Sequence, residues 1–142
     1  MRDQVFSSES NIMKRLKFAL AAILLAGPAG AGLEQEPRIT EGLITVGIAY
    51  EISEVCPSIG ARKLRGLSYL LALRSAAEDL GYTAAEVDAF IDDDAAKDRL
   101  EAIARQRLAD KGARRGDVAA HCRVGEAELA GDSQIGRLLK RN

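Results

Sequence analysis

Apolar residues recur along residues 39–55 at the spacing of an α-helix. They form two adjacent ridges, Ile39, Leu43, Val46 and Tyr50 in the first and Ile44, Ile48, Ile52 and Val55 in the second. Two neighbouring ridges predict a helix that is buried over much of its circumference. The β-branched residues would also suit a strand, but alternation fails at Leu43-Ile44 and the segment is longer than most strands. Helix is the favoured interpretation, with a strand as the alternative.

A second helix is predicted between Ser58 and Leu80. Pro57 disfavours helix at the residue before it, and Ser58 can cap the next helix. Gly81 is typical of the position that follows a helix end. Its apolar residues form two ridges, which we expect to face inward: Leu64, Leu67 and Leu71, and Leu70, Leu73, Ala77 and Leu80.

Three further helices and a terminal turn follow, each marked by a residue that can cap a helix. The first begins with a capping box, Thr83 to Glu86, whose end side chains bond each other's backbone N–H groups. The other predicted N-caps are Asp93 or Asp94, Asp117 and Ser133. The apolar residues expected to face inward are Val87, Phe90, Ile91, Leu100, Ile103, Ala104, Leu108, Val118, Cys122, Leu129, Ile135, Leu138 and Leu139.

Together these segments predict an all-α fold, a compact bundle of about five helices that forms a single domain over residues 39–142. Residues 32–38 contain Glu34, Glu36 and Pro37 without an apolar period. We therefore expect a flexible lead-in there. No internal repeat or second domain is indicated.

Residues 13–31 have the three parts of a cleavable signal peptide. A basic segment, a continuous apolar run and a small-residue cleavage site follow one another, at Lys14 to Lys17, Phe18 to Ala26 and Ala29 to Ala31. The apolar run is about half as long as a membrane-spanning helix, so no stable membrane anchor is expected after cleavage. We assign residues 1–31 to the signal peptide and expect a periplasmic protein. Acidic residues before the basic segment leave both Met1 and Met13 open as the translation start.

The composition argues against nucleic acid as a partner. The formal net charge is −1, from 20 basic and 21 acidic residues, and no basic block is present. Nucleic-acid binding depends largely on neutralising phosphates with Lys and Arg, so we exclude this class. Aromatic residues make up only 4% of the chain and Trp is absent. Stacking platforms for flat cofactors are therefore scarce, and we expect no cofactor.

The two cysteines, Cys56 and Cys122, are predicted to form one disulfide. An even number of cysteines in an exported chain favours this pairing. The bond would join the turn after the first helix to the helix that begins near Asp117. A redox motif would need C-x-x-C spacing, and a zinc site would need two more ligands from a chain with a single histidine.

No other group of residues supports catalysis or metal binding. His121 adjoins Cys122, but neighbours in one helix point about 100° apart and cannot face each other as a nucleophile and its base. We expect an ordinary surface or partly buried histidine. The Gly66–Leu70 segment lacks the second glycine of a nucleophile elbow. Helix capping explains Asp92-Asp93-Asp94 better than calcium binding does, so we expect no metal site.

Short segments across the chain occur in an order that resembles a known family. They are Cys56-Pro57, Leu80-Gly81-Tyr82-Thr83, Glu86-Val87, Ala89-Phe90, Asp92-Asp93, Arg115-Gly116-Asp117, Cys122 and Ile135-Gly136-Arg137-Leu138-Leu139. The chain is similar to an uncharacterised domain-of-unknown-function family of small exported alphaproteobacterial proteins. This resemblance implies a signal peptide, a paired Cys and a helical domain, and it brings no activity or catalytic residue with it.

The sequence favours a non-catalytic protein-interaction or stress-related binding module, in which an apolar groove between helices rich in Ala and Leu receives a segment of an unidentified periplasmic protein. One alternative is a carrier of an apolar small molecule or lipid in the same groove. Another is an enzyme with acid/base carboxylates such as Glu51, Glu54 or Asp79, for which no paired motif is present. An open apolar patch would favour the first, a closed cavity the second and converging carboxylates the third.

Overall fold

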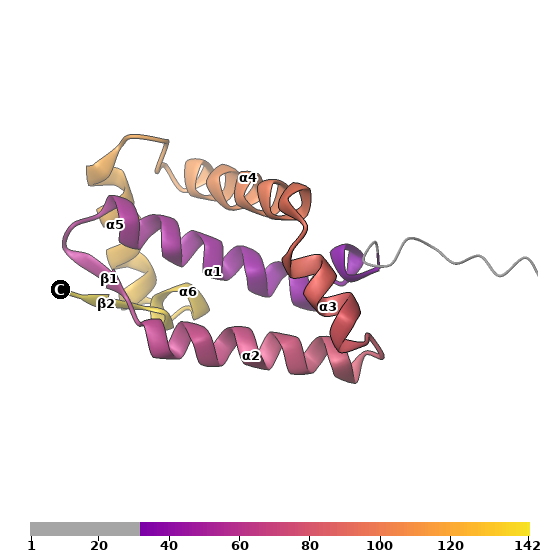
Figure 1. The fold of residues 1–142 in the computed structure, drawn as a ribbon. Coiled ribbons are helices and arrows are strands. Elements are labelled where there is room, and N and C mark those ends of the chain that lie inside the picture. Colours follow the sequence, from indigo (N-terminus) through magenta and orange to yellow (C-terminus); the bar gives the residue numbers. More distant parts are fainter. Residues whose placement is uncertain (1–31) are drawn as a thin grey trace, which may run out of the picture.

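The computed structural model describes residues 32–142, and the predicted signal peptide, residues 1–31, lies outside them. The described residues are mostly helical, with one short two-stranded ribbon (Figure 1). In chain order the elements are η1 (Leu33–Gln35), α1 (Pro37–Val55), β1 (Ile59–Ala61), α2 (Lys63–Asp79), α3 (Ala84–Ile91), α4 (Asp94–Asp110), α5 (Val118–Ala130), α6 (Gln134–Arg137) and β2 (Leu139–Arg141). The prediction of an all-α bundle cross-linked by one disulfide is confirmed.

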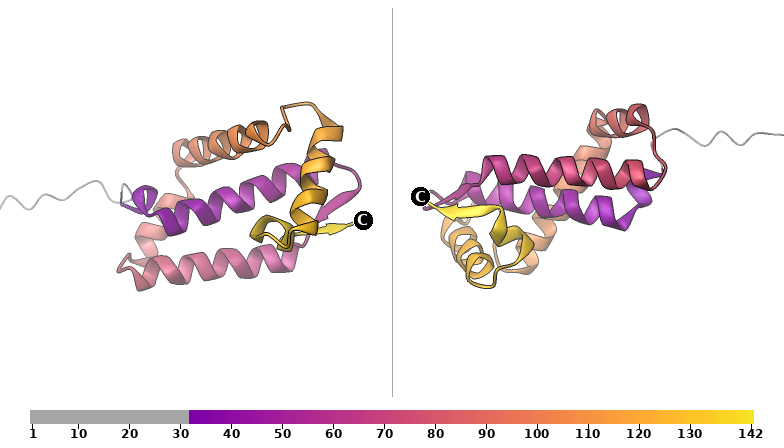
Figure 2. Two further views of the ribbon diagram at one scale, coloured as in Figure 1. Left: turned by 180° about the vertical axis from the view of Figure 1, so that it is seen from behind. Right: turned by 90° about the horizontal axis from the view of Figure 1, so that it is seen from below.

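Helix α1 is the centre of the bundle. It lies between α2 and α4 (Figure 1). α5 crosses the C-terminal end of α1 on the side that faces the viewer in the left view of Figure 2. The ridge of Ile44, Ile48 and Ile52 is at most 3% exposed and packs into the main core with α4, α5 and both strands. The predicted helix over residues 39–55 is therefore confirmed, and the strand alternative is excluded.

The chain after α1 departs from the prediction, because residues 59–61 form a strand instead of a helix that starts at Ser58. β1 pairs with β2 in antiparallel register, with Ile59 opposite Arg141 and Ala61 opposite Leu139. Ile59 and Leu139 are fully buried, so the ribbon closes one end of the core. The backbone partner of β1 comes from the far end of the chain, which a local pattern does not reveal.

The flexible lead-in predicted for residues 32–38 is also wrong, because this segment packs against the bundle. Leu33 is 1% exposed and belongs to a second apolar cluster that includes Phe90 of α3. The Tyr82 hydroxyl donates a hydrogen bond of 3.0 Å to the Glu36 carboxylate. A single buried leucine has no periodicity by which the sequence could reveal it.

Helix α2 meets α1 through one narrow face that contains Leu73, Ala76 and Ala77. Gly42 of α1 permits this approach, because a Cβ atom there would lie 2.5 Å from Cδ2 of Leu73. The opposite ridge, predicted to face inward, is instead exposed: Leu64 by 82%, Leu67 by 54% and Leu71 by 56%. Five other residues predicted inward are 38% to 51% exposed, namely Leu70, Leu80, Ile91, Ile103 and Val118. Periodicity identifies the apolar face of a helix, but it does not show whether another helix packs against that face.

Apart from the start of α2, the predicted helix caps agree with the structure. The Thr83–Glu86 capping box is present, with both of its reciprocal bonds. Asp93, Asp117 and Ser133 each accept backbone N–H bonds at the starts of α4, α5 and α6. Gly81 has a φ of +100°, the left-handed conformation that favours glycine after a helix.

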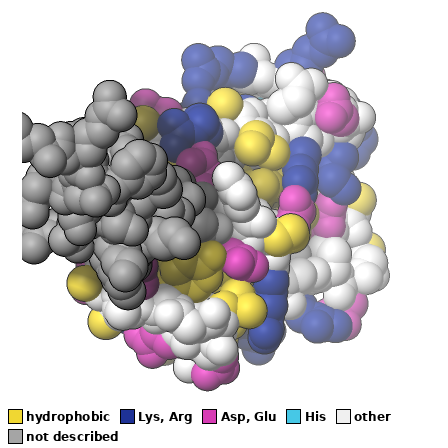
Figure 3. Space-filling model, turned by 90° about the vertical axis from the view of Figure 1, so that its right-hand side faces the viewer, with side chains coloured by type: hydrophobic (Ala, Val, Ile, Leu, Met, Phe, Trp, Pro, Cys, Tyr) yellow, Lys and Arg dark blue, Asp and Glu magenta, His cyan; other side chains and the backbone are white. Residues whose placement is uncertain are grey.

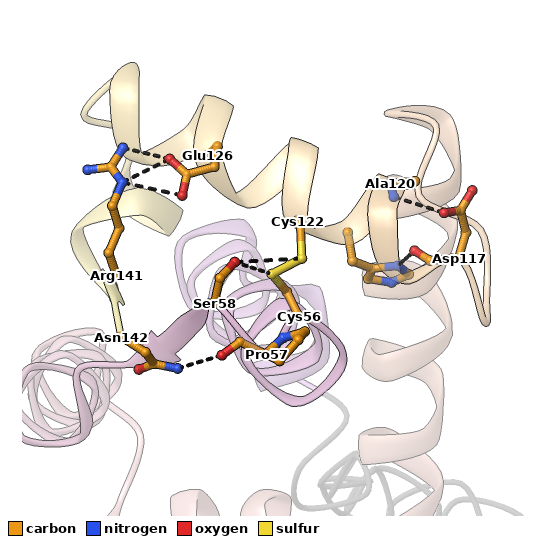
Figure 4. Close-up of a disulfide and its surroundings, with 10 residues drawn as sticks. Cys56, Pro57, Ser58, Asp117, Ala120, Cys122, Glu126, Arg141 and Asn142 are labelled. Atoms are coloured by element: carbon orange, nitrogen blue, oxygen red, sulfur yellow. Dashed lines mark hydrogen bonds and ion pairs between the residues drawn. A yellow bond between two sulfur atoms is a disulfide. The ribbon is translucent and has the colours of Figure 1, made fainter.

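The disulfide joins the end of α1 to α5 (Figure 4). The Cα atoms of Cys56 and Cys122 lie 5.1 Å apart, as a bonded pair requires. The C-terminal residue is held beside this bond, because the Asn142 side-chain amide donates to the Pro57 carbonyl at 3.0 Å. The predicted contact between the fifth helix and the turn after the first is therefore confirmed.

Replacing both Cys56 and Cys122 with serine should lower the melting temperature by roughly 10 °C or more. The two residues are 66 positions apart, and closing a loop of that length contributes about 4 kcal/mol on the chain-entropy model. Scanning calorimetry of the variant, beside wild type with and without a thiol reductant, measures the effect. Equal melting temperatures for the oxidised and reduced proteins would contradict this role.

Glu128 of α5 connects the ends of two other helices. Its carboxylate lies 2.7 Å from Nζ of Lys111, the C-cap of α4, and accepts a hydrogen bond from the hydroxyl of Ser133, the N-cap of α6. Burial alone would raise the pKa of the Glu128 carboxyl. The hydrogen bonds from Lys111 and Ser133 outweigh burial, so this pKa lies below its ordinary value of 4.5.

We expect Glu128→Gln to destabilise the protein at pH 7 by about 1–2 kcal/mol. A pKa depressed by folding means that the carboxylate stabilises the fold above its unfolded-state value, and that this contribution is lost as the pH falls through the lower folded value. Urea unfolding at pH 7 and at about pH 3 should therefore show a difference between variant and wild type that shrinks in acid. Glu126→Gln, at the exposed pair with Arg141, is the control and should have little effect at either pH. A Glu128→Gln effect that does not change with pH would be inconsistent with this assignment.

Candidate binding groove

An apolar groove lies between α1, α2, α3 and α4, with a volume of about 450 Å³. Leu43 and Val46 of α1 form part of its floor, with Leu70 of α2, Ile91 of α3 and Leu100 of α4 around them. No residue of α5 or α6 lines the groove, and these two helices lie together near the C-terminal end of α1 (Figures 1 and 2). The groove uses the ridge of α1 that contains Leu43 and Val46, of which Val46 is partly buried against the main core.

Small residues make room for the groove. Gly47 and Ala104 face each other where α1 approaches α4, and a Cβ atom on Gly47 would lie 3.3 Å from that of Ala104. Ala77 of α2 and Ala96 at the start of α4 also line the groove. Short side chains at these four positions leave a depression that leucines would fill.

The groove is open to solvent along one side. Tyr50, Leu70 and Ile91 line it and are 60%, 38% and 51% exposed. Viewed from the end at which α3 lies, hydrophobic side chains are visible between charged ones (Figure 3). The depression is thus an accessible apolar surface and not an enclosed cavity.

The cations at the edge of the groove are already paired. Arg74 lies 2.6 Å from the Asp88 carboxylate, Lys97 lies 2.7 Å from that of Asp94, and Arg105 lies 2.9 Å from that of Glu101. The hydrogen bonds from Arg74 and from Lys97 lower the pKa of the Asp88 and Asp94 carboxyls. Each of these cations therefore has a carboxylate partner within the chain.

The structure does not gather in the groove the residues that the sequence named as candidate acid/base groups. Of Glu51, Glu54 and Asp79, only Glu51 lines the groove. His121 is 1% exposed, more deeply buried than predicted, and its Nδ1 lies 2.7 Å from the Asp117 carbonyl oxygen. Cys122, beside it, is bonded to Cys56.

The acidic run Asp92–Asp94 serves the start of α4. Asp93 caps the helix, and Asp94 pairs with Lys97. Within residues 32–142 no group of three or more His, Cys, Asp or Glu side chains is arranged to hold a metal ion.

The sequence named the groove residues but assigned most of them to the core. Leu43, Val46 and Tyr50 belong to one predicted ridge of α1, and Leu70 to a predicted inward ridge of α2. Apolar spacing gives the same signal for a buried face and for a face that lines an open groove. The predicted helices have more apolar faces than a small bundle can bury against one another. This excess was the only signal in the sequence that could have indicated the groove.

None of the helices in the described part of the chain is long and apolar enough to cross a membrane.

The sequence model of a family described as being of unknown function, DUF5333, matches residues 31–140. No curated protein and no solved structure matches the chain.

Proposed function

The chain belongs to this family of unknown function, and we propose that it is an exported, non-catalytic binding module whose groove receives the apolar face of a helix from a partner protein. The observation that carries the proposal is the open apolar groove between α1, α2, α3 and α4. Grooves between helices bind amphipathic helices through side chains spaced three, four and seven residues apart.

The charges at the edge disfavour an anionic occupant. Arg74, Lys97 and Arg105 are each engaged with a carboxylate of the chain itself, so an anionic group would have to compete with an existing pair. An apolar helix face with uncharged polar flanks fits the groove without breaking these pairs.

A carrier of an apolar small molecule is the second candidate. The volume of about 450 Å³ lies within the range of sites for small ligands and favours it. Such sites bury most of the ligand surface, whereas here Tyr50 and Ile91 leave one side open to solvent. The partner helix is the better fit, because its polar face would remain in water.

The proposal that the protein is not an enzyme rests on the surroundings of its titratable groups. Glu51 is the one member of the three candidate carboxylates that reaches the groove, and His121 is enclosed next to a bonded cysteine. General acid–base chemistry needs such groups beside a place for a reacting atom.

We expect a neutral apolar dye, N-phenyl-1-naphthylamine, to bind in the groove and to fluoresce more strongly there. Ile91→Glu or Leu70→Glu should lower its affinity about tenfold or more, because each would place a carboxylate among apolar side chains. A helical peptide of about 15 residues, with leucines on one face and uncharged polar residues on the other, should displace the dye. Fluorescence titration measures both effects.

The matched control is Ile103→Glu, which changes an exposed apolar residue of α4 outside the groove. It should leave dye and peptide binding unchanged. Displacement by palmitic acid but not by the peptide would support the carrier instead. A dye that fails to bind, or that binds Ile103→Glu and Ile91→Glu equally weakly, would reject the groove as a binding site.

We also propose that the protein is exported to the periplasm. The segment from Met13 to Ala31 and the disulfide both support export, because disulfides persist in oxidising compartments. N-terminal sequencing of protein from a periplasmic extract should begin at Gly32. A full-length product that remains in the cytoplasm with free thiols would refute export.

A further inference from the structure

The outer face of α2 carries a second apolar surface, separate from the groove. Leu64, Leu67 and Leu71 follow one another at intervals of three and four residues, so they lie in one row, which we name the outer leucine stripe. They are the most exposed leucines of the described chain, and none lines the groove. Single exposed leucines are ordinary on a protein surface, but a continuous row is typical of an interaction site.

No described element covers this stripe. α2 lies at one edge of the bundle (Figure 1), and it is in front when the molecule is seen from below (Figure 2). Its other face, with Leu73, Ala76 and Ala77, is the one that packs toward α1. The stripe is therefore accessible over the N-terminal half of the helix.

Charges of opposite sign stand at the two ends of the stripe. Lys63 directly precedes Leu64 and forms no ion pair within residues 32–142. Glu78 comes seven residues after Leu71 and so continues the row. Its contact with Arg74 is 3.4 Å long, and Arg74 is held more closely by Asp88, at 2.6 Å. The face thus begins with a basic residue, carries its leucines in the N-terminal half and ends with the Arg74–Glu78 pair and its acidic member.

We propose that this face binds a second copy of the chain, with the two α2 helices packed antiparallel about a twofold axis. A twofold interface requires a surface that complements itself. The antiparallel arrangement that places Lys63 of each copy near Glu78 of the other has its axis close to Leu71. Leu71 and Leu67 of the two copies meet there. Leu64 lies toward the end of the contact, beside Lys63. A parallel arrangement would place like charges side by side at both ends.

The size of the face sets the strength of the dimer. α2 has 17 residues and is therefore about 25 Å long. A contact along one helix of this length buries less than the roughly 800 Å² per partner of a standard stable interface. The dimer is consequently weak and dissociates on dilution.

Sedimentation equilibrium of the protein purified after expression of the full chain tests the proposal. Over about a hundredfold range of concentration, the average mass should rise from that of the monomer toward twice that value. Leu67→Glu should remain monomeric, because it places a carboxylate in the middle of the stripe. Val118→Glu, at a similarly exposed position of α5, should dimerise like wild type. Dye binding to Leu67→Glu should be unchanged, so a failure of the dimer and a failure of the groove are distinguishable.

Exchange of the end charges tests the orientation. Lys63→Glu and Glu78→Lys should each weaken the dimer about tenfold, because both create two like-charged contacts in the antiparallel arrangement. The double variant, with both exchanges, should regain wild-type affinity. Wild type that stays monomeric at every concentration would overturn the proposal. That result would also be found if the stripe bound another protein or a lipid surface. Single variants that dimerise as well as wild type would overturn the proposal too, as would a double variant that does not recover.

Discussion

The burial of Ile44, Ile48 and Ile52 on one side of α1 is the interaction on which the rest of the structure depends. These side chains pack with α4, α5 and the two strands, and each contributes roughly 1.5–3 kcal/mol by leaving water. Their burial fixes the orientation of α1 about its own axis. The other ridge, with Leu43, Val46 and Tyr50, is then turned toward α2, α3 and α4, where the groove lies.

The two ends of the bundle are held in different ways. At one end the Cys56–Cys122 bond holds α5 to the end of α1, and the β1–β2 ribbon ties the last strand to the segment after α1. Glu128 of α5 pairs there with Lys111 at the end of α4 and with Ser133 at the start of α6. At the other end a smaller cluster around Leu33 and Phe90 holds η1 and α3 in place. Because α2 touches α1 through only one narrow face, the molecule retains two apolar surfaces, the groove and the outer leucine stripe.

Local signals predicted the parts of the fold that depend on neighbouring residues. The capping box at Thr83, the caps at Asp93 and Asp117 and the glycine at position 81 each act within one turn of helix, and each was correct. The β1 strand and the packing of Leu33 depend on residues far away in the chain, so a local pattern could not predict them. The candidate groove was predicted only in part. Its residues were identified as apolar, but only the arrangement of four helices separates them from the core.

The central claim is that the second ridge of α1 is a binding surface and the isoleucine ridge is not. Methyl NMR of the protein during titration with a leucine-faced helical peptide tests it most directly, because it reports on both ridges at once. We expect the methyl signals of Leu43, Val46, Leu70 and Ile91 to shift and those of Ile48, Ile52 and Val124 to stay unchanged. Shifts confined to Leu64 and Leu67, or spread evenly through the core, would contradict it.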